Sequence, residues 1–175
     1  MSQHYFAHIS PGLEPLLKEE LKSLGARKVK LEEGGVHFQG TRKHLYRVLQ
    51  WSRLANRIYW TLIEGTAPNT NALFERVTKI AWPEIFSPSS KPLKVAIRVS
   101  LSHHVELQGT GQAESIILRA IERSLEGSRV VKSAHWSDPD SEAARVLVRL
   151  HEHRVSVRLD ACGQLLHRRG WRQNE

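Results

Sequence analysis

The sequence has a single cysteine, Cys162, among its 175 residues. One thiol cannot form an intramolecular disulfide and leaves no cysteine-based zinc site, so a reducing, cytoplasmic setting is the default expectation. The first residues also lack a basic stretch followed by an apolar one, and no apolar run approaches membrane-spanning length. These absences predict a soluble protein without a membrane partner.

Catalytic and metal-binding motifs are also scarce. The chain contains no G-x-S-x-G, no H-E-x-x-H and no pair of carboxylates spaced for acid–base catalysis. His151 and His153 would share one face of a strand and could hold an ion together, but the spacing places no third ligand, which favours surface histidines. The sequence therefore predicts neither a catalytic residue nor a metal site.

Gly109-Thr110-Gly111 precedes a helical pattern and raises the question of a phosphate-binding loop, because helix N-termini bind anions. The run lacks the lysine and the further glycines that nucleotide-binding loops carry at set spacing. A loop followed by a helix start is the favoured interpretation, although the exposed amides there could still bind an RNA phosphate.

Acidic residues are outnumbered, since 18 Asp and Glu face 26 Lys and Arg and leave a net charge of +8. This excess of positive charge either only keeps the protein soluble or attracts a polyanionic partner. From residue 143 onward seven arginines stand against three acidic residues, and the planar guanidinium suits phosphates and stacked bases. Aromatic residues interleave with basic ones, as at Trp51 near Arg53, and Trp136 and Trp171 are candidates for stacking. Nucleic acid is the favoured partner.

The apolar spacing of the first 65 residues predicts the order strand, helix, strand, strand, helix, strand. The strands are expected at 5–9, 29–31, 36–38 and 57–63, with one helix from Ser10-Pro11 to Gly25 and another after Gly40-Thr41. This is the βαββαβ order of a ferredoxin-like fold, in which two helices cover one face of a four-stranded antiparallel sheet.

A second α/β unit is expected beyond a linker at residues 65–69. Its predicted helices are 71–80 and 112–125, and its predicted strands are 93–101, 143–150 and 154–160. On the longest helix Arg119 and Arg123 fall together on the exposed side, opposite the apolar stripe.

Several phrases of the sequence resemble, in order, the N-terminal region of bacterial THUMP-domain RNA methyltransferases. They are SPGLEPLLKEELKSLGA, EEGGVHFQG, LYRVLQWSRLANRIYWTL, ALFERVTKIAWPE and SVRLDACGQLLHRRGWR, and the most specific pieces are the runs at 51–57 and 163–172. These proteins are similar to the enzymes that methylate guanine N2 in large-subunit ribosomal RNA. The stretch before the long helix departs from the family, whose members usually show Asn-Thr-Gln-[FY] there.

The resemblance implies an α+β fold, with a ferredoxin-like domain at 1–65, an α/β THUMP RNA-binding domain at 66–170 and a linker stub at 171–175. The family's N-P-P-[YF] turn and its glycine-rich loop for S-adenosylmethionine are absent from the sequence. The chain is therefore expected to be an RNA-binding module that is not an enzyme on its own and holds no cofactor. S-adenosylmethionine is expected only for a missing catalytic domain, supplied in cis or in trans.

Two alternatives stay open at this point. The chain could be a fragment of an active RNA methyltransferase whose catalytic domain lies beyond Glu175, or it could be a protein-interaction module with solvated basic faces.

The expected partner is structured RNA, ribosomal by resemblance, recognised through phosphates and shape and without readout of a DNA sequence. Arg149, Arg154 and Arg158 are expected to face solvent across the last pair of strands instead. The residues predicted to contact RNA are Ser102, His103, Gln112, Arg119, Arg123, Arg129, Lys132, Arg145, Arg168, Arg169, Trp171 and Arg172.

Overall fold

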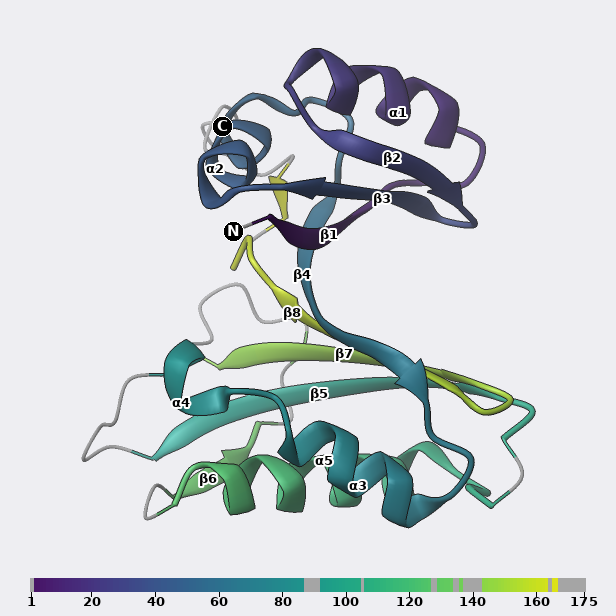
Figure 1. Cartoon of the computed structure of the whole chain (residues 1–175), viewed down its shortest axis with the longest axis vertical. Helices are drawn as coiled ribbons and strands as arrows, with labels where there is room; N and C mark the ends of the chain where they lie inside the picture. Colours follow the sequence, from purple (N-terminus) through teal and green to yellow (C-terminus); the bar gives the residue numbers. More distant parts are fainter. Residues whose placement is uncertain are drawn as a thin grey trace, which may run out of the picture. The chain divides into compact units, whose positions relative to one another are not determined.

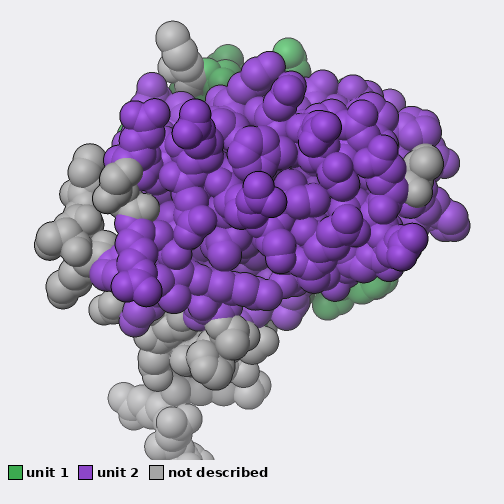
Figure 2. Space-filling view, turned by 90° about the horizontal axis from the view of Figure 1, so that it is seen from below, with its two compact units in different colours: residues 1–61, 160–175 green, residues 62–159 purple. Residues whose placement is uncertain are grey.

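The computed structural model describes residues 2–86, 92–104, 106–126, 129–133, 136, 143–163 and 165–166. Within them, eight strands are hydrogen-bonded in the order β2-β3-β1-β4-β8-β7-β5-β6 (Figure 1). The chain divides into two compact units, the first made of residues 1–61 with 160–175 and the second of residues 62–159 (Figure 2). Helices and strands occur in both units, which confirms the predicted α+β class.

The first unit is ferredoxin-like. β1 pairs antiparallel with both β3 and β4, and β2 pairs antiparallel with β3. Leu17, Leu21 and Val48, from the two helices, share one core with Tyr5 and Phe38 of the sheet, so both helices cover the same face. The elements are β1 (Gln3–His8), α1 (Glu14–Ser23), β2 (Arg27–Glu32), β3 (Gly35–Gly40), α2 (Arg42–Trp51) and β4 (Arg57–Thr66).

Helix α1 begins later than the sequence predicts. Ser10-Pro11 was the expected start, but Gly12 adopts φ +90°, a left-handed conformation that a helix cannot contain. The carboxylate of Glu14 accepts hydrogen bonds from the amides of Gly12 at 2.7 Å and Gly34 at 3.1 Å. The helix therefore starts at Glu14, where this side chain also holds the turn between β2 and β3. It ends at Ser23, and the predicted terminating glycine, Gly25, follows the C-cap Leu24 with φ +90°.

Residues 160–166 return to the first unit. Arg57 forms an ion pair with Asp160, and the backbone amide of Ala161 donates to the carbonyl of Ile58 at 2.9 Å. Farther on, the Leu166 amide donates to the Asn56 carbonyl at 3.0 Å. The predicted division at residue 65 falls inside β4, and the units divide instead at 61/62 and at 159/160.

The second unit is a mixed sheet with helices packed on one face. β5 pairs parallel with β6 and β7, and β7 pairs antiparallel with β8. Side chains of α3 and α5 share a core with one face of β5 and β7, and Figure 2 shows this unit in purple from the side that carries the helices. The elements are α3 (Thr70–Thr78), α4 (Trp82–Ile85), β5 (Leu93–Ser102), α5 (Thr110–Ser124), β6 (Val130–Lys132), β7 (Ala144–His151) and β8 (Arg154–Asp160).

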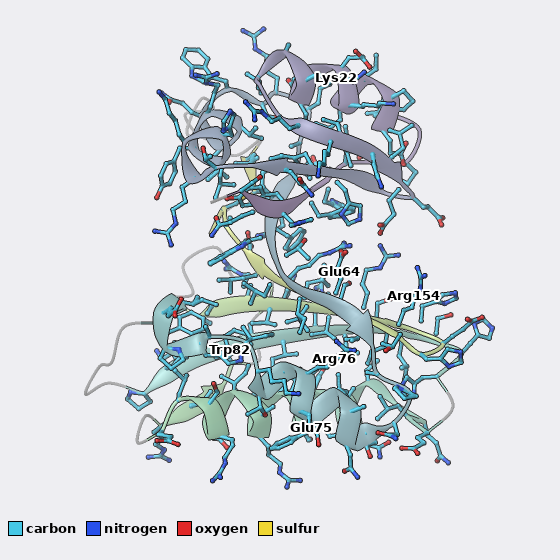
Figure 3. All side chains as sticks on the ribbon, in the orientation of Figure 1. Lys22, Glu64, Glu75, Arg76, Trp82 and Arg154 are labelled. Atoms are coloured by element: carbon cyan, nitrogen blue, oxygen red, sulfur yellow. The ribbon has the colours of Figure 1, made fainter. Side chains whose placement is uncertain are left out.

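Short α4 and β6 were not predicted, because neither is long enough to show a period. α4 is fixed by Trp82, which is fully buried, donates its indole N–H to the Val77 carbonyl at 2.8 Å and stacks on Phe86 (Figure 3). No helix in the part of the chain that the structure describes is long and apolar enough to cross a membrane.

Candidate nucleic-acid interface

Helix α5 presents the clearest of the predicted basic positions. Ala113, Ile117 and Ile121 are buried, whereas Arg119 and Arg123 are exposed one turn apart, as the sequence predicts. Neither arginine has an ion-pair partner among the residues that the structure describes. Gln112 is also exposed, in the first turn.

Lys132 in the edge strand β6 and Arg129, directly before that strand, are two further exposed cations. The Lys132 ammonium lies 2.5 Å from a carboxylate oxygen of Glu114, which belongs to the first turns of α5. This ion pair ties β6 to the helix and offsets the charge of Lys132. Arg129 is therefore the stronger candidate of the two for a phosphate contact.

Ser102 and His103 come together at the end of β5. The Ser102 hydroxyl lies 2.8 Å from Nδ1 of His103, and the His103 ring meets His151 edge-on with centroids 6.0 Å apart. His151 was absent from the predicted set, since only the parallel pairing of β5 with β7 brings it there. Among the described residues, no three His, Cys, Asp or Glu side chains are grouped to hold a metal.

Arg145 is buried, with 4% of its surface exposed, although the sequence predicts an RNA contact there. Its Nε donates to the carbonyl of Trp136 at 2.9 Å, while the Arg98 guanidinium lies over the Trp136 ring at 4.7 Å from the centroid. Arg145 thus supports the backbone of Trp136, and the exposed cation beside that ring is Arg98. Alternation along the strand at 93–101 could have identified Arg98, because it separates buried Ile97 from Val99.

Two arginines of the last strand differ in a way that the sequence did not predict. Arg154 is exposed, but Arg158 is buried, with 2% exposed, and its Nη2 lies 3.8 Å from Glu64 Oε1 (Figure 3 labels Arg154 and Glu64). The expectation that Arg158 faces solvent is therefore wrong. The remaining predicted contacts, Arg168, Arg169, Trp171 and Arg172, lie outside the described residues.

The sequence of the chain is similar to part of a known methyltransferase. The family model of the RlmL ferredoxin-like domain matches residues 4–59. Across 172 residues the chain is 34% identical to the ribosomal RNA large subunit methyltransferase K/L of Methylococcus capsulatus, and the match covers 98% of this chain and 22% of that protein. The first unit thus resembles the RlmL ferredoxin-like domain, and the chain as a whole resembles about a fifth of that methyltransferase.

Solved structures share the fold. A possible methylase from Clostridium difficile 630 matches with a TM-score of 0.80 and 24% identity, over 99% of this chain and 45% of that one. SMU.472, a candidate methyltransferase in complex with SAH, matches with a TM-score of 0.76 and 22% identity, again over 99% and 45%. The chain thus spans under half the length of each.

The expectation that the chain is not an enzyme is contradicted by these comparisons. Its relatives carry the names of methyltransferases and methylases, and one of the matching folds was solved with SAH.

Proposed function

We propose that this chain is the RNA-recognition part of an S-adenosylmethionine-dependent methyltransferase that modifies guanine N2 in large-subunit ribosomal RNA. The observation that carries the proposal is the 34% identity to an rRNA large subunit methyltransferase along 98% of the chain. Within it, residues 62–159 are the THUMP domain, which holds folded RNA and presents it for methylation.

Exposed cations of the second unit supply the contacts. Arg119 and Arg123 on α5 and Arg129 before β6 are exposed, and neither Arg119 nor Arg123 forms an ion pair with an acidic side chain that the structure describes. Double-helical RNA is recognised mainly through phosphates and shape, for which planar guanidinium groups suit better than ammonium groups. The proposal therefore predicts binding with little dependence on base sequence.

S-adenosylmethionine would supply the methyl group. Gly109, the N-cap of α5, and Gly111, in its first turn, border open space, since a side chain at either would meet no protein atom within 4 Å. The segment also lacks the further glycine of a dinucleotide-binding loop, so no step of methyl transfer is assigned to it.

RNA binding is tested by titrating the chain with a ribosomal RNA hairpin and with a DNA hairpin of the same sequence at several salt concentrations. Reversal of charge in the double variant Arg119→Glu/Arg123→Glu should weaken RNA binding and flatten its salt dependence. A matched control, Lys18→Glu/Lys22→Glu, changes the net charge equally and has the same one-turn spacing, but on α1 (Figure 3 labels Lys22). Equal loss in both variants, or salt-independent binding, would contradict the proposal.

The methyltransferase part is tested in the cell. Deleting the gene should remove an N2-methylguanine from large-subunit ribosomal RNA, measured by mass spectrometry of nuclease fragments. Unchanged methylation of every guanine would reject this activity while leaving the binding result intact.

A further inference from the structure

Helix α2 of the first unit combines positive charge with exposed aromatic rings. Residues 34–63 contain no Asp or Glu, yet they hold five Lys or Arg. Tyr46 and Trp51 are 63% and 61% exposed, among the most exposed large hydrophobic side chains that the structure describes. Exposed apolar side chains that gather on one face, rather than singly, mark binding surfaces. None of these residues was among the predicted RNA contacts.

The basic and aromatic side chains form one stripe. Leu45, Val48 and Leu49 turn toward the core of the first unit, so the opposite side of α2 faces outward. On that side cations and rings alternate at helical neighbour spacing, three or four residues apart. The stripe consists of Arg42, Lys43, Tyr46, Arg47 and Trp51, all of them exposed.

Both ends of α2 are held firmly. At the start, the Thr41 amide donates to Nδ1 of His44 at 3.2 Å. At the end, Glu20 of α1 accepts from the Ser52 hydroxyl at 2.6 Å and from the Arg53 amide at 2.8 Å. The backbone that carries Trp51 is therefore fixed. Glu20, an acidic group close to the end of the stripe, is engaged by these donors.

We infer that the α2 stripe binds unpaired bases of RNA, with Tyr46 and Trp51 stacking on bases and Arg42, Lys43 and Arg47 contacting phosphates. Stacking on aromatic side chains within a basic surface is the general way in which proteins hold single strands. A helix with three cations and no acidic residue of its own fits a polyanion and repels a basic partner. The inference rests on the proposed function, because it names the RNA element that the first unit recognises.

The test measures binding of a single-stranded ribosomal RNA oligonucleotide and of a fully paired hairpin to the whole chain. Trp51→Ala and Tyr46→Ala should each weaken single-strand binding about tenfold, with the hairpin little affected. Trp51→Phe should retain most of the binding, because a ring remains for stacking. Leu16→Ala is the matched control, since Leu16 is an exposed apolar residue of α1 with 58% exposed, and it should bind as the wild type does.

Salt dependence separates the cations from the rings. The triple variant Arg42→Ala/Lys43→Ala/Arg47→Ala should lower the slope of log affinity against log salt by about 2, given about 0.7 for each single-strand phosphate contact. The aromatic variants should leave that slope nearly unchanged. Circular dichroism and thermal melting of each variant verify that the fold is kept.

The outcomes distinguish this inference from the proposed function. Normal single-strand binding by Trp51→Ala and Tyr46→Ala, or an equal loss in Leu16→Ala, overturns the inference. If reversal at Arg119 and Arg123 still weakens hairpin binding, the proposed function survives. A wild-type chain that binds neither RNA overturns both.

Discussion

Helices α2 and α5 both carry exposed arginines one turn from another cation or ring, but they differ in the charges and rings that surround those arginines. α5 has two arginines and two glutamates in its 15 residues, so its own charges cancel. α2 has two arginines and a lysine in 10 residues, no acidic residue, and two exposed rings. A count of basic residues on an exposed face does not identify a nucleic-acid surface. The inference for α2 adds two criteria, which are the sign of the neighbouring charges and the presence of uncovered rings.

Reversing the charge on each helix tests most strongly whether α2 and α5 differ in RNA binding. Arg42→Glu/Lys43→Glu/Arg47→Glu should weaken single-strand RNA binding about 100-fold at low salt, because three attractive contacts become repulsive. Arg119→Glu/Arg123→Glu should weaken the same binding less than tenfold. Fluorescence anisotropy with labelled RNA measures both. Similar losses on the two helices would mean that net charge alone governs binding.

Removing the support of α2 should cost stability as well as binding. Glu20→Ala leaves the Ser52 hydroxyl and the Arg53 amide without this acceptor, and we expect the free energy of unfolding to fall by about 2 kcal/mol. Urea unfolding measures the change. Glu19→Ala is the control, because Glu19 forms only an exposed pair with Lys22 and should alter stability by less than about 1 kcal/mol. An equal loss of unfolding free energy in the two variants would show that the hydrogen bonds to Glu20 do not stabilise the end of α2.

Neutralising an acidic residue on α5 should give this helix a net positive charge, as α2 has, and strengthen its binding to RNA. Glu122 is exposed beside Arg119 and Arg123, and Glu122→Gln should strengthen hairpin binding about threefold at low salt, with the gain fading at high salt. Glu75→Gln is a control on α3, where Glu75 is also exposed (Figure 3). An equal gain in the control would assign the effect to net charge.

Acid should loosen the unit that carries α2. Hydrogen bonds from its own amide and from those of Gly34 and Gly12 hold the pKa of Glu14 below the ordinary 4.5. Because the folded pKa is depressed, its contribution to stability is present above pH 4.5 and is lost as the pH falls through the folded value. Wild type should therefore exceed Glu14→Gln in urea midpoint at pH 7, with the gap closing below pH 4.5. A difference in urea midpoint that stays constant with pH would show that the ionised Glu14 carboxylate does not stabilise the fold.

The sequence was sufficient where a local pattern carried the information. Strand and helix order in the first unit, and the buried stripe of α5, follow from apolar spacing. The start of α1 was missed because the backbone conformation of Gly12, rather than any apolar period, decides it. The return of residues 160–166 to the first unit depends on partners about a hundred positions away, such as Arg57 for Asp160.

The candidate contacts were only partly predictable for a similar reason. A basic residue in a strand looks the same whether its side chain is exposed or buried, and Arg145 proved to be buried against Trp136. Trp51 was noted beside Arg53 in the sequence, but spacing alone could not show that its ring is uncovered. The run of thirty residues without an acidic side chain was the available signal for α2.

The most direct test of the central claim, that α2 meets unpaired RNA, is ultraviolet crosslinking of the whole chain to a ribosomal RNA fragment containing both a loop and a stem. Tryptic peptides carrying nucleotides are then identified by mass spectrometry. The account predicts loop nucleotides on the peptides spanning residues 44–53, which contain Tyr46 and Trp51. Nucleotides found only on peptides from residues 62–159 would contradict it.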